Sequence, residues 1–281
     1  MHSYWAPVHY RTPRLADEAR FGYAQYARTH DYLLGGKNSY AEDRDLGERL
    51  LLVFPDLRES LWASREFQLR ATRGLAAEGV GQFLELGAGY PSNSWAVHTV
   101  AREVNPEAKV LYVDFDPIVA AHHRAFGIAD DTDFLEADIT DTVGLIEQAR
   151  PILDFGAPMV VSLCGVLEHI ENAAAVVRTL STAVAPGSFL VISHIVTDSD
   201  EQLVEAIAAQ YRNRGLHFHP RSSGDLSAMF SGRGLVVPGM IQPDRWHVID
   251  DGPLPVDREQ LDGPAHTELH CRATIGRRLA E

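Results

Sequence analysis

The sequence predicts an α/β protein: a mainly parallel sheet with helices on both faces, preceded by a helical segment. Two observations support this fold class. Five apolar runs after residue 80 alternate with helical stretches of about ten residues. The first run ends in the turn Gly87-Ala88-Gly89 and the second ends in Asp114, so together they form a βαβ unit shaped to hold a nucleoside.

The segment before the glycine turn is predicted to be an N-terminal helical cap. Residues 1–28 show no clear period, and residues 28–44 form a polar, glycine-bearing stretch that we interpret as a loop. Apolar residues recur at three- and four-residue spacing from residue 41 to residue 77, with a break at Pro55, which predicts two consecutive helices. We therefore assign residues 1–79 to the cap and residues 80–281 to the nucleoside-binding domain.

The later elements follow from the same alternation of apolar runs and helical stretches. Strands are expected at residues 81–86, 109–114, 132–136, 158–164 and 188–194. Helices are expected at residues 94–104, 117–126, 142–150, 172–184 and 200–213. Two further strands are expected at residues 235–237 and 268–275, and the second suits an antiparallel edge hairpin.

Composition and charge restrict the partners that this chain can have. The 281 residues carry a formal net charge of −14 and contain no Lys/Arg-rich run, which argues against nucleic acid as a partner. No apolar run approaches the roughly 18 to 20 residues of a membrane span, and the first residues lack a signal-peptide pattern. Cys164 and Cys271 lie in apolar stretches and are expected to be buried thiols. We expect a soluble cytoplasmic protein without a membrane partner, with a homodimer as an open alternative.

The glycine turn carries an electrostatic signal. Gly87 and Gly89 allow a tight bend that brings backbone amides close to a ligand. A dehydrogenase turn would add a third glycine three residues on, but Ser92 and Asn93 follow here. Glu85 precedes the turn, where a carboxylate would repel a pyrophosphate and favour an ammonium group. The turn therefore predicts a cationic ligand.

Acidic residues follow the second and third predicted strands. Asp114 stands where a carboxylate can accept hydrogen bonds from both hydroxyls of a ribose. Asp138 follows the third strand, where an acid can accept from the amino group of adenine. The alternative for Asp138, and for Asp116 before Pro117, is that the carboxylate only caps a helix.

Four short motifs occur in sequence order: Glu85-Leu-Gly-Ala-Gly89, Asp114, Asp138 and Gly165-Val-Leu-Glu-His-Ile170. Together they resemble the motifs of class I S-adenosylmethionine-dependent methyltransferases. Three upstream segments are also similar to the N-terminal signature of an actinobacterial group of S-adenosyl methyltransferases: Asp31-Tyr-Leu-Leu-Gly-Gly-Lys-Asn38, Ala41-Glu-Asp-Arg44 and Phe54-Pro-Asp-Leu-Arg58. The resemblance implies a Rossmann-like, seven-stranded sheet with a reversed last strand, and S-adenosylmethionine as the cofactor.

The resemblance also implies which residues meet the cofactor. The methionine part would face Glu85, Gly87 and Gly89, the ribose Asp114, and the adenine Asp138 and Ile139. Further candidates for cofactor binding are Ala88, Phe115, Cys164, Tyr32 and Lys37. One departure concerns the turn itself. The smaller group commonly has a Thr-Gly or Thr-Ser turn there, whereas this chain continues Ala88-Gly89-Tyr90. A local rearrangement near the carboxylate of the cofactor is therefore expected.

Glu168 and His169 follow the fourth predicted strand, at the edge of the sheet where ligands bind in open α/β folds. His169 is a candidate general base, and His194 at the end of the fifth strand is a second one. The alternative is that Glu-His is a shape feature shared by methyltransferases with unrelated acceptors. A similar Glu-His helps to bind a divalent metal in small-RNA 2′-O-methyltransferases, which have a further acid three residues before the Glu. Gly165 stands at that position here, so no metal site is expected.

The polar loop between residues 28 and 44 has the composition of a lid. We predict that Lys37 or Arg44 binds a carboxylate of the cofactor or the acceptor; the alternative is a solvated loop. Five other residues are expected either to line an acceptor pocket or to lie in the core: Trp246, His247, Tyr23, Tyr26 and Trp62.

Three functions remain open on the sequence alone. The first is methyl transfer from S-adenosylmethionine to a small-molecule acceptor, for which a specialised metabolite is a candidate. The second is an enzyme that uses the same cofactor for non-methyl chemistry, and the third is a non-catalytic regulatory protein that binds the cofactor. A Rossmann oxidoreductase is disfavoured by Glu85 and by the missing third glycine.

Overall fold

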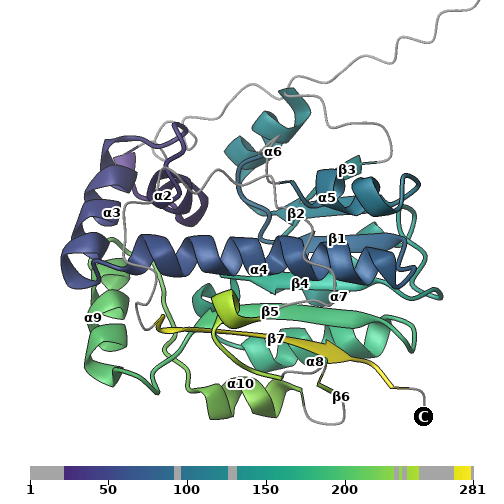
Figure 1. Cartoon of the computed structure of the whole chain (residues 1–281). Coiled ribbons are helices and arrows are strands. Elements are labelled where there is room, and N and C mark those ends of the chain that lie inside the picture. The colour runs from purple at the N-terminus through teal and green to yellow at the C-terminus, as the bar shows by residue number, and fades with distance from the viewer. Residues whose placement is uncertain are drawn as a thin grey trace, which may run out of the picture.

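A mixed sheet with helices on both faces forms the centre of the chain in the computed structural model (Figure 1). The structure describes residues 22–91, 96–125, 132–230, 234–235, 239–246 and 269–279. The strand order is β3-β2-β1-β4-β5-β7-β6. The strands are β1 (Gln82–Leu86), β2 (Lys109–Asp114), β3 (Thr132–Glu136), β4 (Val160–Cys164), β5 (Phe189–Ile195), β6 (Gly234–Leu235) and β7 (Cys271–Arg277).

Strands β1 to β5 pair in parallel, which confirms the predicted mainly parallel sheet. Cys271–Arg277 form β7, which pairs with β6 as the expected antiparallel hairpin at the edge of the sheet. β7 lies between β5 and the two-residue β6 and is antiparallel to both. Ala273, Thr274 and Ile275 are all buried, because β7 is covered on both faces of the sheet. Residues 236–237 of the expected strand at 235–237 lie outside the described residues.

The helices downstream of residue 41 agree with the expected ranges except for α10, a short helix that was not expected. They are α2 (Tyr26–Leu33), α3 (Ala41–Val53), α4 (Leu57–Ala77), α5 (Val97–Val104), α6 (Pro117–Ala125), α7 (Thr142–Ala149), α8 (Ala173–Ala183), α9 (Glu201–Arg212) and α10 (Ser223–Met229). Two 3₁₀ turns, η2 (Leu167–His169) and η3 (Pro243–Arg245), complete the described elements. In the described ranges, no helix combines the length and the apolar character that crossing a bilayer demands.

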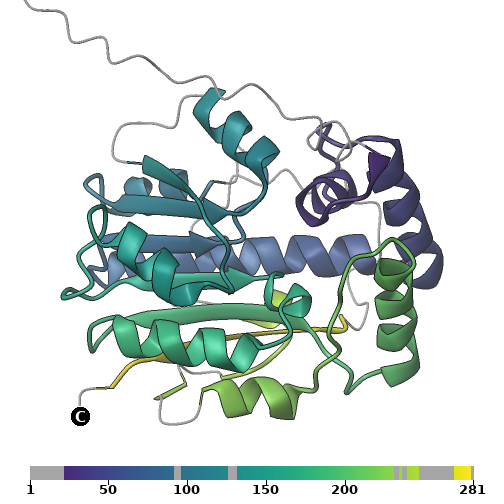
Figure 2. The same ribbon diagram turned by 180° about the vertical axis from the view of Figure 1, so that it is seen from behind.

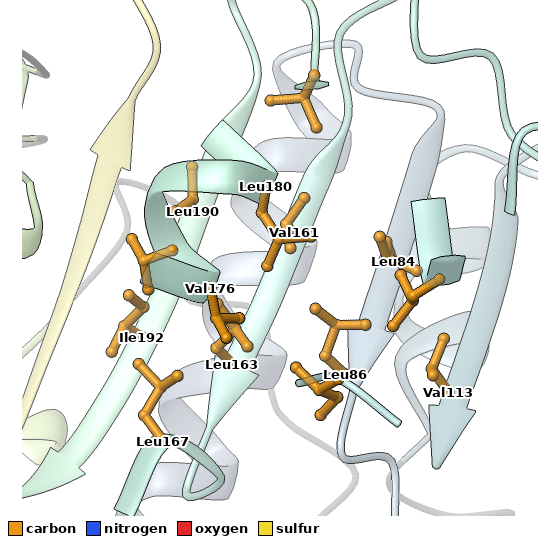
Figure 3. Close-up of a cluster of buried hydrophobic side chains, with 14 of the residues drawn as sticks. Leu84, Leu86, Val113, Val161, Leu163, Leu167, Val176, Leu180, Leu190 and Ile192 are labelled. Carbon is orange, nitrogen blue, oxygen red and sulfur yellow. The ribbon is translucent and has the colours of Figure 1, made fainter. Parts of the chain in front are cut away.

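Alternating residues of each strand supply the two halves of the core. One set, which includes Leu84, Val113 and Val161, packs beneath α7 and α8 (Figure 3). The other set, which includes Phe83 and Val160, packs beneath α4 and α5, so the two faces carry different helices (Figure 2). Each such buried aliphatic or aromatic side chain stabilises the fold by roughly 1.5–3 kcal/mol relative to an exposed one.

Helix α4 is a layer of the sheet domain. Phe67, Leu69 and Leu75 on this helix share one apolar cluster with strand residues such as Phe83 and Val160. The helix runs along the full length of the strands it covers (Figure 1). The division of the chain at residue 79 stays a prediction. The shared cluster contains residues from both sides of that boundary.

Helices α2 and α3 lie with α9 beyond the carboxyl ends of the parallel strands (Figure 1). The predicted loop at residues 28–44 is wrong in extent, because α2 continues to Leu33 and α3 begins at Ala41. Tertiary packing explains the difference: Leu33 and Leu46 are buried in one cluster with residues of α9 such as Ile207. Only residues 34–40 connect the two helices.

Candidate functional site

A cavity of about 510 Å³ opens at the carboxyl edge of the sheet. Its described lining comes from the ends of β1 to β4 on one side and from α2, α4, η2 and α9 on the other. β1 and β4 are neighbours although β2 and β3 intervene in the sequence, so the strand order reverses here. This reversal is the switch point at which open α/β sheets bind ligands.

Glu85 lies at the bottom of this cavity and is almost fully buried. Its Oε1 accepts hydrogen bonds from Gln68 Nε2 at 2.7 Å and from Arg65 NH1 at 3.2 Å. Its Oε2 is buried and has no hydrogen-bond partner among the described residues. Burial raises the pKa of Glu85, and the Arg65 guanidinium and the Gln68 amide oppose that rise. The carboxylate is therefore held in place while one oxygen keeps its full capacity to accept.

Arg65 and Gln68 come from α4, and neither was predicted to reach the cavity. Gln68 Nε2 also donates to Ser162 Oγ at 2.6 Å, and Ser64 Oγ lies 2.5 Å from Ser193 Oγ. These polar contacts attach the helix to β4 and β5. The signal available in the sequence was a group of polar residues, 64, 65 and 68, on a helix whose other positions pack on the sheet.

The glycine turn and Asp114 form one hydrogen-bonded unit. Gly87 and Gly89 have φ of +71° and +63°, in the left-handed region that favours glycine. A Cβ on Gly87 would also lie 2.6 Å from the side chain of Val166. Gly89 N donates to Asp114 Oδ2 at 2.9 Å, and Asp116 N donates to Asp114 Oδ1 at 3.0 Å. Burial raises the pKa of Asp114, and these backbone N–H groups oppose the rise.

The other acids at the edge also have local contacts. Asp116 Oδ1 accepts from Ile118 N at 2.8 Å, so this residue caps the start of α6 and lines the cavity as well. Asp138 Oδ1 accepts from Thr140 N and from Thr140 Oγ1. The capping alternative therefore holds for Asp116 but not for Asp138, because Asp141 is the N-cap of α7. The adenine role of Asp138 stays a prediction.

The remaining predicted cofactor residues of the sheet lie around the same cavity. Phe115 is half exposed, Ile139 is buried, and both line the cavity beside Asp138. Cys164 lines it from the end of β4, and burial raises the pKa of its thiol to about 12. This thiol is neutral at physiological pH.

His169 reaches the cavity from η2. Its Nδ1 lies 3.0 Å from the carbonyl oxygen of His217. A carbonyl only accepts, so Nδ1 carries the hydrogen and Nε2 carries the lone pair. Burial lowers the pKa of His169, and Glu168 opposes that shift.

Glu168 supports this turn from behind. Its Oε1 accepts from Ile195 N at 3.0 Å, which ties η2 to β5, and the residue lines a small annex of about 30 Å³ next to the cavity. Its Oε2 is buried and has no hydrogen-bond partner among the described residues.

The geometry argues against the predicted role of His194 as a second base. Its side chain is fully buried and is not part of the described lining of the cavity. Its Nδ1 donates to Ile195 O at 2.5 Å, and Arg221 NH1 lies 3.3 Å from its Nε2. Ser193 is the register partner of the cavity residue Cys164, so these two side chains share one face of the sheet. Successive side chains of a strand point to opposite faces, so His194 lies on the other face.

Three rings that contribute to the cavity wall were missed or left open by the sequence analysis. His30 and Tyr26 come from α2, and Tyr211 comes from α9. Burial lowers the pKa of His30 to about 4, and the nearby Arg65 and His169 add to this shift. No signal in the sequence places α9 beside α2, since that contact arises only from the tertiary packing.

The segment that connects α2 and α3 is held by specific contacts. Asp31 Oδ2 accepts from Asn38 N at 2.8 Å, and Arg58 NH1 donates to Leu33 O at 2.7 Å. Arg28 and Asp43 form a fully buried ion pair at 2.8 Å. These contacts order the turn in this structure, and its predicted role as a lid stays a prediction.

The predicted cofactor residues Tyr32 and Lys37 are not part of the described lining of the cavity. The Tyr32 hydroxyl bonds to Glu48, and its ring lies 5.3 Å from the Arg58 guanidinium. Lys37 is exposed, and Arg44 NH1 donates to Ser39 O at 2.7 Å. Asp31, Gly36 and Asn38 line the cavity from this turn in their place.

The other aromatic candidates divide between core, surface and cavity. Trp246 is buried and packs edge-on against Phe67 at 5.3 Å between ring centroids. Trp62 is buried too, Tyr23 is exposed, and His247 lies outside the described residues. Of this group, Tyr26 is the residue that the structure brings to the cavity.

Fold and site together define a nucleoside-binding α/β protein of the doubly wound type, with an acid-lined cavity at the strand reversal. The chain belongs to the S-adenosyl methyltransferase family, because the model of that family matches residues 15–277. Two solved structures are similar over most of their length. One is a proposed methyltransferase from Thermobifida fusca YX, with 31% identity, a TM-score of 0.82, and coverage of 95% of this chain and 100% of that chain.

The other is a DUF574 family protein from Streptomyces avermitilis MA-4680, with 28% identity and a TM-score of 0.81. That match covers 92% of this chain and 98% of the other. No curated protein matches this chain. The family defines the cofactor, which is S-adenosylmethionine.

The residues of the cavity fit this cofactor. A volume of about 510 Å³ lies within the range of roughly 300–1,000 Å³ that is usual for small-molecule sites. The unpartnered Oε2 of Glu85 is a ready acceptor for the ammonium group of the methionine part. Asp114 lies one strand away, as a ribose requires, and the carboxylates at the edge disfavour a polyphosphate.

Proposed function

We propose that this protein transfers a methyl group from S-adenosylmethionine to a small-molecule acceptor. One observation carries the proposal: a single cavity joins the acids of the strand ends to the rings of α2, η2 and α9. The acid end suits the cofactor and leaves the ring end for an acceptor. A specialised metabolite is our candidate class.

S-adenosylmethionine supplies an activated methyl group on a sulfonium. The protein's part is to align the two reactants, exclude water and accept a proton where the acceptor must lose one. Glu85 would hold the ammonium group, and Asp114 the ribose hydroxyls, with each charge-assisted hydrogen bond worth about 1.5–3 kcal/mol. The backbone at Gly87 and Gly89 would allow the close approach that this binding needs.

His169 is our candidate for the group that accepts a proton. The bond from its Nδ1 to His217 O leaves Nε2 as the lone-pair nitrogen, and the residue lines the cavity. Glu168, behind it, is better described as a positioning residue, because its Oε1 accepts from Ile195 N and so fixes the turn that presents His169.

We also propose that α2 and α3 act as a fixed cap over the site and that the segment at residues 31–38 is the signature of a smaller group in the family. The contacts of this segment support a structural role for its residues. A Cβ on Gly36 would overlap the carboxylate of Asp31, and that carboxylate binds Asn38 N. Asp31 and Asn38 thereby shape the turn that borders the cavity.

The alternative of a non-catalytic regulatory protein predicts that the segments at residues 28–44 and 246–247 block the edge of the sheet. Their described parts favour catalysis: α2 lines an open cavity, and Trp246 packs on Phe67 in the core. The alternative of non-methyl chemistry is separated by the product that is formed.

The test begins with binding. Isothermal titration should show that S-adenosylhomocysteine binds and that NADH does not, because the acids of the cavity repel a pyrophosphate. Mass spectrometry of reactions with candidate acceptors should then detect S-adenosylhomocysteine as the product. Release of methylthioadenosine instead would support the non-methyl chemistry, and binding of NADH alone would refute the proposal.

A further inference from the structure

The acceptor end of the cavity is walled by contiguous rings. The ring centroids of Tyr26 and His169 lie 4.1 Å apart, and those of His169 and Tyr211 lie 5.2 Å apart. Behind them, Tyr211 stacks on Phe218 at 5.4 Å with an angle of 17° between the planes. These distances fall within the range of favourable aromatic pairs, which is about 4.5–7 Å, or just below it.

Each ring of the wall is held by contacts outside the cavity. His217 N donates to the Tyr26 hydroxyl at 2.6 Å, and His169 Nδ1 donates to His217 O at 3.0 Å. One residue of the loop after α9 thus fixes a ring of α2 and a ring of η2. The wall needs little ordering when a ligand binds, and preorganisation of this kind favours affinity for a ligand of matching shape.

The described residues at the ring end of the cavity offer no cationic side chain to an anionic acceptor. Five described residues of the lining carry a carboxyl group: Asp31, Glu85, Asp114, Asp116 and Asp138. Arg65 is the one lysine or arginine among the described lining residues, and it is paired with Glu85. Burial lowers the pKa of His30 and of His169, so these imidazoles are neutral near pH 7. An acceptor with a carboxylate or a phosphate would find no lysine or arginine among the described lining residues except Arg65, which is already paired with Glu85. The rings of the wall offer such an anion no opposite charge.

From these features we infer that the acceptor is an uncharged planar aromatic compound whose nucleophile is a hydroxyl group. The inference rests on the proposed function and narrows its substrate class. The aromatic wall favours a planar ring, and the lone pair on His169 Nε2 favours a group that must lose a proton. A neutral amine can attack before it loses a proton and so has less need of a base.

In the transfer step the hydroxyl oxygen forms a bond to the methyl carbon as the carbon–sulfur bond breaks. The electron pair of that bond stays on sulfur, which becomes a neutral thioether. The hydroxyl proton passes to Nε2 of His169, and the resulting imidazolium is stabilised by the bond from Nδ1 to His217 O and by the nearby Glu168 carboxylate. Atoms and charge balance without a further reactant.

Three matched probes test the inference. Binding of 2-naphthol, 2-naphthoate and decahydro-2-naphthol is measured by calorimetry or ligand-observed NMR on the full chain saturated with S-adenosylhomocysteine. We expect 2-naphthol to bind at least tenfold more tightly than the carboxylate and at least fivefold more tightly than the saturated alcohol. Equal or tighter binding of either control, or no binding of 2-naphthol, overturns the inference and leaves the proposed function standing. Failure of S-adenosylhomocysteine itself to bind overturns both.

Variants of the wall provide a second readout. Tyr211→Leu and Tyr26→Leu keep most of the volume but remove the ring, and each should weaken 2-naphthol binding at least fivefold. Affinity for S-adenosylhomocysteine should stay within twofold, which also shows that the variants fold. Tyr23→Leu is the matched control, because Tyr23 is 65% exposed and outside the described lining. Unchanged 2-naphthol affinity in both wall variants would refute the role of the rings.

Discussion

Two arginine–carboxylate pairs with a buried carboxylate lie in neighbouring parts of this protein, and the two carboxylates differ in how many of their oxygens accept hydrogen bonds. Asp43, in the first turn of α3, accepts from Gln25 N on Oδ1 and from Arg28 Nε and Tyr40 N on Oδ2, each at 2.8 Å. Glu85, at the bottom of the cavity, accepts from Arg65 on Oε1. Its Oε2 has no hydrogen-bond partner among the residues that the structure describes.

The difference separates a structural pair from a binding site. Burying a carboxylate costs free energy unless its oxygens accept hydrogen bonds. Both oxygens of Asp43 do so, from donors in the hairpin formed by α2, α3 and the residues next to them. Oε2 of Glu85 has no donor among the described residues, although Gln68 and Arg65 hold the carboxylate firmly. Because the unmet oxygen of Glu85 lies beside the cavity, we propose that it binds a ligand. The same isosteric change at the two sites should test this.

The largest effect is expected at the structural pair. In Asp43→Asn, either orientation of the amide turns a donor toward a backbone N–H and leaves the buried Arg28 without a counter-charge. We expect a loss of about 3–5 kcal/mol in the free energy of unfolding, measured by urea denaturation. Glu205→Gln is the control, since its pair with Arg212 is half exposed and worth about 0.2–1 kcal/mol. A loss below about 1 kcal/mol at Asp43 would remove the distinction between the pairs.

The acid of the neighbouring strand should matter chiefly for binding. Asp114→Ala removes the carboxylate assigned to the ribose, and S-adenosylmethionine affinity should fall at least tenfold, or about 1.5–3 kcal/mol, by isothermal titration. Asp154→Ala, at an exposed turn on the far side of the sheet, should leave affinity unchanged. Equal affinity of the Asp114 variant and the wild type would refute the ribose assignment.

Glu85→Gln is the partner experiment to Asp43→Asn. The amide can keep its oxygen toward Gln68 and Arg65 and place its nitrogen where Oε2 was, so stability should change by less than about 1 kcal/mol. The same nitrogen would face the ammonium group, and S-adenosylmethionine affinity should fall about tenfold, or about 1.4 kcal/mol. A large loss of stability together with intact affinity would mean that Glu85 is structural.

His30 lies in α2 and lines the cavity. Its pKa in the folded protein is about 4, against 6.5 in the unfolded chain. Between these values the unfolded chain binds the extra proton, so stability falls as the pH drops below 6.5. At pH 5.5 the wild type should have lost about 1 kcal/mol more than His30→Gln, both relative to pH 7.5, by urea titration. Parallel pH curves for the two proteins would show that His30 is not shielded from water.

The smallest effect is expected for the exposed lysine of the turn. Lys37→Ala should change S-adenosylmethionine affinity less than twofold, because Lys37 is exposed and outside the described lining of the cavity. Arg65→Lys, in contrast, should weaken binding, since a lysine cannot contact both Glu85 and Gln68 in the same geometry. A tenfold loss in the Lys37 variant would restore its predicted role at the cofactor.

Much of the strand edge could be predicted from the sequence, because its signals are local. Gly87 and Gly89 have the positive φ that their turn requires, and Asp114 ends β2 beside them. Apolar runs and turns also gave the expected strand ranges to within two residues at β1 through β5. Such features depend on residues only a few positions away in the sequence, so the pattern of apolar and turn residues predicts them.

The opposite wall of the cavity could not be predicted in the same way. Tyr26, His169 and Tyr211 are far apart in the sequence and meet only because α2 and α9 pack together beyond the sheet. The polar character of residues 26–33 resembles a loop, and a helix forms there because Leu33 and the Arg28–Asp43 pair anchor it. For His194 the sequence predicts a position near the carboxyl end of β5. It does not predict that the side chain contacts Arg221, which is distant in the sequence.

The insertion of β7 between β5 and β6 has a consequence for synthesis in the cell. β5 pairs with β7 along seven residues, all of them buried in the finished sheet. While residues 271–277 are still inside the ribosome, the backbone N–H and C=O groups on this edge of β5 are unpaired. An apolar strand with an unpaired edge is prone to pair with another chain. A nascent chain paused before this point, or a transcript truncated there, should therefore depend on chaperones more than the completed protein does.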